Sequence, residues 1–154
     1  MIEVRPSTAN DAYDLFLNLH PMTRNEIENA GIAPGNVLTH IRTAVCAAGS
    51  STVEINGEVV IVAYSMPLVP GKRTTGFLAA NCRDGRKLTF AARRWAARER
   101  MRHPNTEFIA ASFSTHPERD RFLEALGMHK VEDQPTFTLF SDSRPALDMA
   151  QPLL

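Results

Sequence analysis

The sequence predicts an α+β fold in which helices are layered on a central sheet, and three observations predict it. Two strand-like runs, STVEI and EVVIVAYSM, are joined by Asn56-Gly57, a favoured dipeptide of two-residue hairpins. A helical pattern over residues 85–101 lies between two further strand-like segments. Residues 114–133 read as a helix that stops at Gly127 and runs directly into a strand.

The N-terminal third is predicted to hold one strand and three helices. Residues 2–5 alternate like a short strand, and a helix after the polar run STAND has Ala12, Leu15, Phe16 and Leu19 on one side. The spacing of Thr23 and Glu26 is that of a capping box, so a second helix is expected from Thr23 to Gly31. Apolar residues at helical spacing predict a third helix over residues 36–48.

The rest of the chain supplies the inner strands and two helices. The unbroken run VVIVAYSM predicts a strand that is covered on both faces. Residues 67–74 are expected to form a loop because of their prolines and glycine, and residues 75–80 form the next strand. The long helix is expected to turn one partly apolar face inward, formed by Leu88, Ala91, Ala92, Trp95, Ala96 and Glu99. A strand over residues 107–112, a helix burying Phe122, Leu123 and Leu126, and two closing strands complete the order.

Composition is that of one soluble domain. The chain has 154 residues, 44% hydrophobic and 22% charged, and we expect a domain over residues 1–141 followed by a tail over residues 142–154 that orders only against a partner. We expect no membrane partner, because no apolar run approaches the roughly 18 residues of a membrane helix. The first residues show no secretion signal, which predicts cytoplasmic synthesis. Cys46 and Cys82 have neither metal-site nor disulfide-framework spacing, so no metal is expected.

Charge is unevenly distributed although the net charge is zero. The segment over residues 83–102 has a charge of +6, from Arg83, Arg86, Lys87, Arg93, Arg94, Arg98, Arg100 and Arg102 against Asp84 and Glu99. An anionic ligand or partner is one reading of this segment, and a solvated helix face is the other. A sequence pI near 7.0 and few aromatic residues argue against nucleic acid as a partner.

The order of elements resembles the GCN5-related N-acetyltransferase (GNAT) fold. Within it, the chain is most similar to the GNAT-like proteins of short-tailed phages, the family that includes internal virion protein A. The segments that support this resemblance are VRPSTANDAYDL, EIENAGI, AARRWAARERMRHP and THPERDRFLEALGMH. The resemblance implies an α/β/α arrangement with a mixed, mostly antiparallel sheet, and other phage virion proteins as partners. It also implies a location in the host cytoplasm during assembly, and leaves open whether the protein stays in the finished virion.

The same resemblance implies a site for acetyl-CoA at the start of the long helix, where family members bind the pyrophosphate through a loop of pattern Arg/Gln-x-x-Gly-x-Gly/Ala. Free backbone donors at a helix N-terminus suit such a group. Here the loop spans residues 82–87, and Gly85 is the residue that matches. We expect Arg83, Arg86 and Lys87 to replace the lost backbone contacts by charge pairing, so the site is a degenerate one.

Catalytic residues are harder to place. The family often uses a tyrosine four residues before the glycine that ends the later helix, and Leu123 occupies this position. A leucine cannot transfer a proton, so His116 and Ser114 are the candidate substitutes. His116 also suits a helix cap with an exposed imidazole. Tyr64 and Ser65 lie where family members position an amine, or are ordinary strand residues.

Three functions remain open from the sequence. The first is a role in virion structure or morphogenesis through protein contacts, with catalysis eroded. The second is an acetyl-CoA-dependent N-acetyltransferase that acts on a small amine or a host protein. The third is a protein that binds CoA as a structural ligand without turnover.

Overall fold

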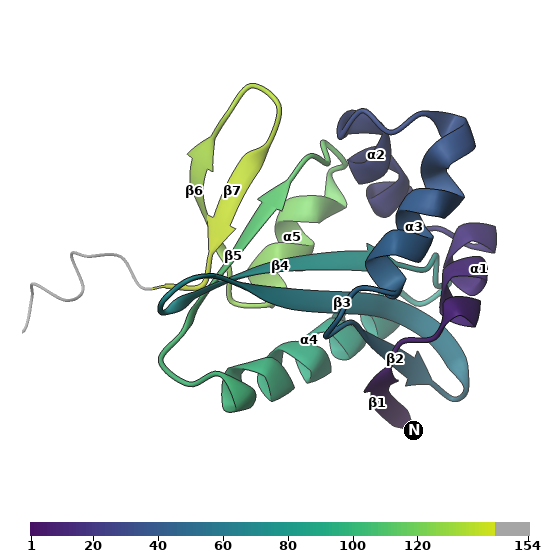
Figure 1. The fold of residues 1–154 in the computed structure, drawn as a ribbon, viewed down its shortest axis with the longest axis horizontal. Coiled ribbons are helices and arrows are strands. Elements are labelled where there is room, and N and C mark those ends of the chain that lie inside the picture. The colour runs from purple at the N-terminus through teal and green to yellow at the C-terminus, as the bar shows by residue number, and fades with distance from the viewer. Residues whose placement is uncertain (144–154) are drawn as a thin grey trace, which may run out of the picture.

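The structure, a computed structural model, describes residues 1–143, in which a seven-stranded sheet lies between two layers of helices (Figure 1). The elements in chain order are β1 (Ile2–Pro6), α1 (Ala9–Leu17), α2 (Pro21–Asn29), the short 3-10 helix η1 (Pro34–Asn36), α3 (Val37–Val45), β2 (Ser51–Ile55), β3 (Glu58–Val69), β4 (Lys72–Ala79), α4 (Gly85–Arg102), β5 (Glu107–Ser112), α5 (Glu118–Ala125), β6 (His129–Asp133) and β7 (Thr138–Ser141).

The strands lie in the order β1-β2-β3-β4-β5-β7-β6. Among the described residues, β4 and β5 pair in parallel and every other neighbouring pair is antiparallel. The expectation of a mixed, mostly antiparallel sheet is therefore confirmed. A parallel pair needs a long crossover, and here that crossover is α4.

The sheet opens in its middle, between β4 and β5 (Figure 1). These strands pair over Lys72–Thr74 and Glu107–Ile109, and from there β4 continues to Ala79 while β5 continues to Ser112. We call the space between the unpaired parts of the two strands the β4–β5 gap. Residues of α2 and of α5 line this gap.

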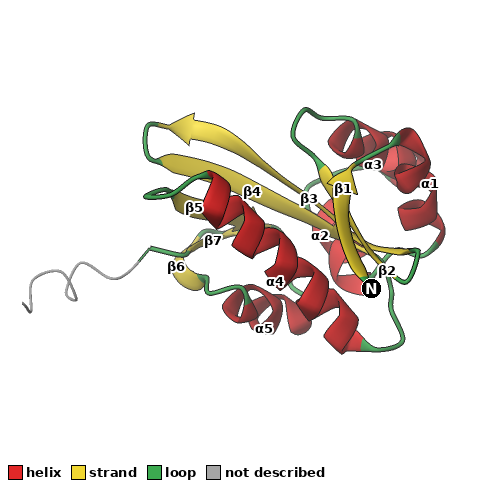
Figure 2. Cartoon of the chain, turned by 90° about the horizontal axis from the view of Figure 1, so that it is seen from below, coloured by secondary structure: helices red, strands yellow, loops and turns green. Residues whose placement is uncertain are grey.

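Two hydrophobic clusters fill the space between the sheet and its helices. One joins α4 and α5 to a face that includes Ile61 and Ala79, and the other joins α1 and α3 to the opposite face at Val62 and Leu78 (Figure 2). Helix α2 contributes Met22 to the first cluster and Ile27 to the second. It therefore sits at the border between the two layers.

Several local predictions are confirmed. Asn56 and Gly57 both have positive φ, 52° and 81°, as a two-residue turn of this kind requires. Residues 60–63 of β3 are completely buried, so this strand is an inner one. Helix α4 begins at Gly85, and its six expected inward residues are all buried, including Glu99. Strand β5 has the expected bounds.

The predicted capping box at Thr23 and Glu26 is wrong. Helix α2 begins two residues earlier, at Pro21, and His20 caps it by accepting a hydrogen bond from Met22 N–H at its Nδ1 (2.9 Å). Proline suits the first helical position because its missing N–H would have no partner there. The side chains of Thr23 and Glu26 are thereby free to contact other elements.

The predicted loop over residues 67–74 is also wrong. Strand β3 runs on to Val69 and β4 already begins at Lys72, so the connection is a tight turn with Gly71 at φ 80°. The prolines are accommodated because the pairing is irregular between Pro67 and Val69.

Asp142 lies directly after β7 and is held by the domain. Its Oδ1 accepts from Phe108 N–H (2.8 Å), and its Oδ2 lies 3.4 Å from Arg100 Nε. Residues 144–154, most of the predicted tail, lie outside the described residues.

Candidate functional site

A cleft of about 360 Å³ lies between the start of α4 and the start of α5. Its lining is drawn from α2, α4, α5 and the residues before them: His20, Met22, Cys82, Gly85, Arg86, Leu88, Thr89, Glu118, Arg121 and Phe122. The N-terminus of α4 gives this cleft free backbone donors and a partial positive charge. With two arginines added, it suits a phosphate-bearing ligand.

The four predicted cofactor-binding residues divide into two pairs. Gly85 and Arg86 line the cleft, whereas Arg83 is exposed and, like Lys87, lies outside the lining. Arg121 of α5 supplies a second guanidinium that sequence reasoning missed. The distance along the chain between Arg86 and Arg121 explains why no local pattern could join them.

Asp84 caps α4 and works against an anion in the cleft. Its carboxylate accepts from Arg86 N–H (3.0 Å) and lies 3.4 Å from Arg86 Nε. The backbone hydrogen bond from Arg86 lowers the pKa of Asp84, so this residue is ionised at neutral pH. A phosphate at the helix start must therefore compete with this carboxylate for one backbone donor.

His20 and Glu118 form a close pair at the edge of the cleft. His20 Nε2 lies 3.3 Å from Glu118 Oε2, and the capping bond from Met22 N–H occupies His20 Nδ1. Burial lowers the pKa of His20, and the nearby His116 acts in the same direction, which together outweigh the opposing effect of Glu118. The imidazole is therefore neutral at pH 7, with its Nε2–H directed at the carboxylate.

The two predicted catalytic residues lie beside this pair. The ring of His116 is 6.0 Å from that of His20, and its Nδ1 accepts from Glu118 N–H (3.2 Å), so it caps α5. Ser114 is 1% exposed, and its hydroxyl lies 3.2 Å from the main-chain oxygen of Met22. Ser114 thus joins the segment after β5 to α2 and does not face the cleft.

A smaller cavity of about 50 Å³ occupies the β4–β5 gap. Its lining residues are Met22, Thr23, Glu26, Thr75, Gly76, Phe77, Ala110, Ala111, Ser112, Arg119, Phe122 and Leu123. Met22 and Phe122 line both this cavity and the cleft. The cleft at the start of α4 and the cavity in the gap are therefore neighbours, with Met22 and Phe122 at their border.

The backbone of β4 turns polar groups into the gap. Ala79 N–H donates to Thr23 Oγ1 (3.0 Å), and Ala79 O accepts from His20 N–H (2.9 Å), which shows that these groups point away from β3. Phe77 lies two residues earlier and has the same orientation, beyond the last paired residue, Thr74. Its N–H is the β4 donor that a carbonyl oxygen in the gap can reach.

Helix α2 bridges the two strands across the gap. On the β4 side Thr23 receives the hydrogen bond from Ala79. On the β5 side Glu26 accepts from the Ser112 hydroxyl (2.8 Å) and from Phe113 N–H. One helix thus satisfies backbone groups of both strands where they no longer pair with each other.

Glu26 is a partly buried carboxylate with a perturbed pKa. Burial raises the pKa of Glu26, and the hydrogen bonds from Ser112 and Phe113 and the charge of Arg119 offset only part of this effect. The charge of Glu26 in turn adds to burial in raising the pKa of Tyr64. Tyr64 lies across Gly76, where an added Cβ would approach its Cζ to 2.2 Å, so β4 requires glycine at this point.

Leu123 and Ser65, named from the family pattern, are structural. Leu123 is 4% exposed and packs in the core beside the gap. Ser65 is buried, and its hydroxyl donates to Glu99 (3.0 Å) and accepts from Arg73 Nε (2.9 Å).

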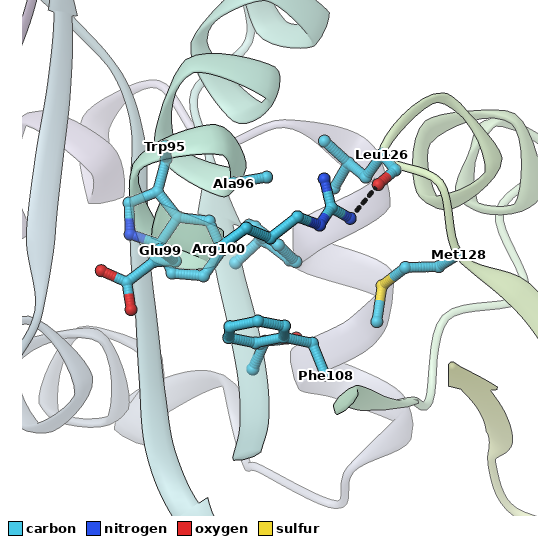
Figure 3. A pocket seen from close by; sticks show the side chains of 9 residues that line it. Trp95, Ala96, Glu99, Arg100, Phe108, Leu126 and Met128 are labelled. Atoms are coloured by element: carbon cyan, nitrogen blue, oxygen red, sulfur yellow. Dashed lines mark hydrogen bonds between the residues drawn. The ribbon is translucent and has the colours of Figure 1, made fainter. Parts of the chain in front are cut away.

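The basic residues of α4 lie in different environments along the helix. Arg86 reaches the cleft, whereas Arg94, Arg98 and Arg102 line a shallow hollow on the outer face of α4 beside Val4. A cavity of about 20 Å³ lies near the other end of α4, where Arg100 Nη2 donates to Leu126 O (2.5 Å; Figure 3). It is about the size of a single water molecule, so we assign it to packing.

Residues 1–143 show neither a metal cluster nor a membrane-spanning helix. This part of the chain brings together no group of three His, Cys, Asp or Glu side chains suited to a metal ion. None of its helices is both long enough and apolar enough to cross a bilayer.

The comparisons with known proteins give a fold. No protein-family model and no curated protein matches the chain. Among solved structures, it is similar to the aminoglycoside acetyltransferase AAC(6')-Ib in complex with ribostamycin and coenzyme A (TM-score 0.68, 19% identity, 96% of each chain covered). It is also similar to the GNAT domain of S. lividans PAT (TM-score 0.67, 12% identity, 91% of this chain and 89% of that one).

A third similar structure is the PaiA N-acetyltransferase from Thermoplasma acidophilum in complex with coenzyme A (TM-score 0.61, 11% identity, 94% of this chain and 99% of that one). At these identities the similarity establishes the fold, and the chain has the GNAT fold, as the sequence predicted. The comparisons give no support to the narrower resemblance to internal virion protein A.

Proposed function

We propose that this protein is an acetyl-CoA-dependent N-acetyltransferase. The observation that supports the proposal is the adjacency of two spaces: a cationic cleft at the start of α4 and the β4–β5 gap have Met22 and Phe122 in common in their linings. A ligand with an anionic end and a thin reactive arm fits this shape. Similar structures that contain coenzyme A or acetyl-CoA make that ligand the leading candidate.

The donor set of the cleft fits a pyrophosphate with one reservation. Arg86, Arg121 and the first-turn N–H groups of α4 supply positive charge and hydrogen-bond donors, while the Asp84 carboxylate competes for Arg86 N–H. Arginine pairing has to compensate for that competition. Of the four residues that the sequence predicts for this site, Gly85 and Arg86 line the cleft, and Arg121 takes the place of the other two in this proposal.

Acetyl-CoA, when bound, supplies the thioester whose acetyl group is transferred. Phe77 N–H faces the gap and would hold the thioester oxygen, where it stabilises the negative charge that develops during attack. The apolar side chains of Phe77, Phe122 and Leu123 line the same gap, and a less polar environment strengthens such an interaction.

The acceptor is proposed to be an amine, either of a small molecule or of a protein. The similar structures support this class, since they include an aminoglycoside acetyltransferase and N-acetyltransferases.

A second candidate function is the one expected from the phage resemblance: a protein of virion structure or morphogenesis that acts through contacts with other virion proteins in the host cytoplasm. Two observations favour loss of catalysis. Leu123 is buried where the family often places its acid, and Asp84 occupies a donor at the helix start. If CoA still binds, it would then act as a structural ligand.

Calorimetric titration with acetyl-CoA tests the first proposal. We expect a dissociation constant in the micromolar range, about 8 kcal/mol, and at least a tenfold loss in R86A/R121A. The matched control is R94A/R98A, which removes the same charge from the outer face of α4 and should bind like the wild type.

The titration separates the candidates. Equal weakening in both double mutants would show that overall charge attracts the ligand and that the cleft is not its site. No heat at millimolar ligand would contradict the acetyltransferase proposal. Co-purification of the protein with capsid or portal proteins would then support the second candidate.

A further inference from the structure

We propose that Glu26 is the general base that takes the proton from the acceptor amine. The inference rests on the proposed acetyltransferase function and assigns a catalytic role within the same site. It follows from the position of Glu26 on α2, from the groups around it, and from the other uses of neighbouring candidates.

Glu26 is placed where an acceptor would meet a thioester held from the cleft. It lines the β4–β5 gap together with Gly76 and Phe77. The cleft opens on the side of α4 and α5, whereas Tyr64, which faces Gly76 across the strands, lies on the sheet face that α1 and α3 cover. Glu26 therefore lies beside Gly76 and Phe77, the strand residues next to which the thioester is proposed to sit.

The charge environment suits a base. Within residues 1–143, no Lys, Arg or His nitrogen lies within 4.0 Å of the Glu26 carboxylate. Arg119 of α5 is the cation that faces it, but Arg119 donates to Asp120 (2.7 Å) and to Ser114 O (2.6 Å). Tyr64 of β3 faces it as a neutral phenol at pH 7. An incoming ammonium would therefore be the direct charge partner of this carboxylate.

Burial raises the pKa of Glu26 towards the range in which a carboxylate is an effective base near neutral pH. Ser112 and Phe113 hold both oxygens in place, so the carboxylate has a fixed orientation. This geometry needs no side-chain rearrangement before proton transfer.

The neighbouring candidates have other uses. The Ser114 hydroxyl bonds to Met22 O and is sealed from solvent. His116 Nδ1 caps α5, and His20 Nδ1 caps α2 while its Nε2 pairs with Glu118. Of the residues that line the gap, Glu26 is the carboxylate.

The step balances without another reactant. A primary ammonium gives one proton to Glu26, and the freed amine attacks the thioester carbonyl carbon. The C–N bond forms, the C–S bond breaks, and the second nitrogen proton passes to the departing sulfur, which leaves as a thiol. Glu26 then returns its proton to solvent. The substrate class is accordingly a primary amine that arrives as a cation.

The test compares E26Q with E28Q, the same substitution on the exposed side of the same helix. Glutamine keeps the size of the side chain, and the Ser112 hydroxyl can turn to accept from its amide. The acceptors to screen are kanamycin, spermidine and a lysine peptide. With wild-type turnover established, E26Q should lower kcat/KM by about 100-fold and remove the acid limb of its pH profile, while E28Q should change neither.

A second readout does not depend on turnover. Carbon-detected NMR titration of the protein without ligand should show one glutamate with a raised pKa, which E26Q removes and E28Q leaves. Wild-type kinetics in E26Q, or no such glutamate signal, would overturn this inference and leave the acetyltransferase proposal intact. No acetyl-CoA binding by the wild type would overturn both.

Discussion

Asp11 and Glu26 are carboxylates on neighbouring helices, the first fully buried and the second partly buried, and they have similar hydrogen-bond donors apart from one. Asp11 accepts from Thr8 N–H and from the Thr52 hydroxyl, just as Glu26 accepts from Phe113 N–H and the Ser112 hydroxyl. Asp11 also receives two bonds from the Arg5 guanidinium, at 2.8 and 2.9 Å. Glu26 has no such bond.

The pKa values of the two groups move in opposite directions. Burial alone would raise the pKa of Asp11, but the bonds from Arg5, Thr8 and Thr52 together lower it. For Glu26 burial prevails, and its pKa rises. A backbone N–H and a hydroxyl therefore do not offset burial by themselves. The guanidinium makes Asp11 a structural ion pair that also holds Glu54, while Glu26 keeps its reactivity.

Breaking the Asp11 pair should have the largest effect. R5M leaves a buried carboxylate without its cation, so we expect the free energy of unfolding to fall by about 3 kcal/mol, measured by urea denaturation. R24M, which removes an exposed arginine on α2, should stay within about 0.5 kcal/mol of the wild type. Equal losses in the two variants would show that Arg5 contributes little through Asp11.

A second pair of variants removes the hydroxyl that donates a hydrogen bond to each carboxylate. T52V and S112A should each cost about 1 kcal/mol of stability. In carboxyl NMR titrations, S112A should raise the pKa of Glu26 further, and T52V should raise that of Asp11 by less because Arg5 remains. A larger change at Asp11 would contradict the dominant role that we give to the guanidinium.

E26Q should stabilise the protein slightly at pH 7, by about 1 kcal/mol or less. The substitution removes the cost of burying an ionised group, which is the pattern expected where a site gives up stability for function. Thermal unfolding of E26Q and E28Q side by side measures this difference. A clear loss of stability in E26Q would show that the carboxylate chiefly holds β5 in place.

The smallest effects are on the pH dependence of stability, and they have opposite signs. The pKa of Asp11 is lowered by folding. Its ionisation therefore stabilises the fold above the unfolded-state pKa of about 3.9, and this stabilisation is lost as the pH falls through the folded-state pKa. The pKa of Glu26 is raised by folding. Its contribution to the free energy of unfolding is therefore fully present below the unfolded-state pKa of about 4.3, and it is lost as the pH rises through the folded-state pKa. D11N should flatten the loss of stability in acid, and the gain in E26Q should vanish there.

Much of the fold could be predicted from local patterns. The Asn56-Gly57 turn, the inner strand β3 and the inward face of α4 each depend on residues that are close in sequence. The capping box failed because Thr23 and Glu26 contact Ala79 and Ser112, and no local spacing reveals such distant partners.

The candidate site was predictable only in part for the same reason. Gly85 and Arg86 were found from the loop pattern, since a helix start is a local feature. His20 lies at the start of α2, Glu26 lies within α2, and Arg121 lies in α5. Only the folded sheet brings His20 and Arg121 to the cleft and Glu26 to the gap. Their identification required the positions of the strands.

The bridge that α2 makes across the β4–β5 gap has a consequence for self-association. A sheet that parts in its middle has two inner edges besides its two outer ones, and an unpaired edge is a template for any extended chain. Thr23 and Glu26 cover part of both inner edges with side chains, which leaves room for a narrow ligand but not for a strand. If α2 detached, the gap would expose two unpaired strand edges to other chains, so we expect the docking of this nine-residue helix to limit aggregation.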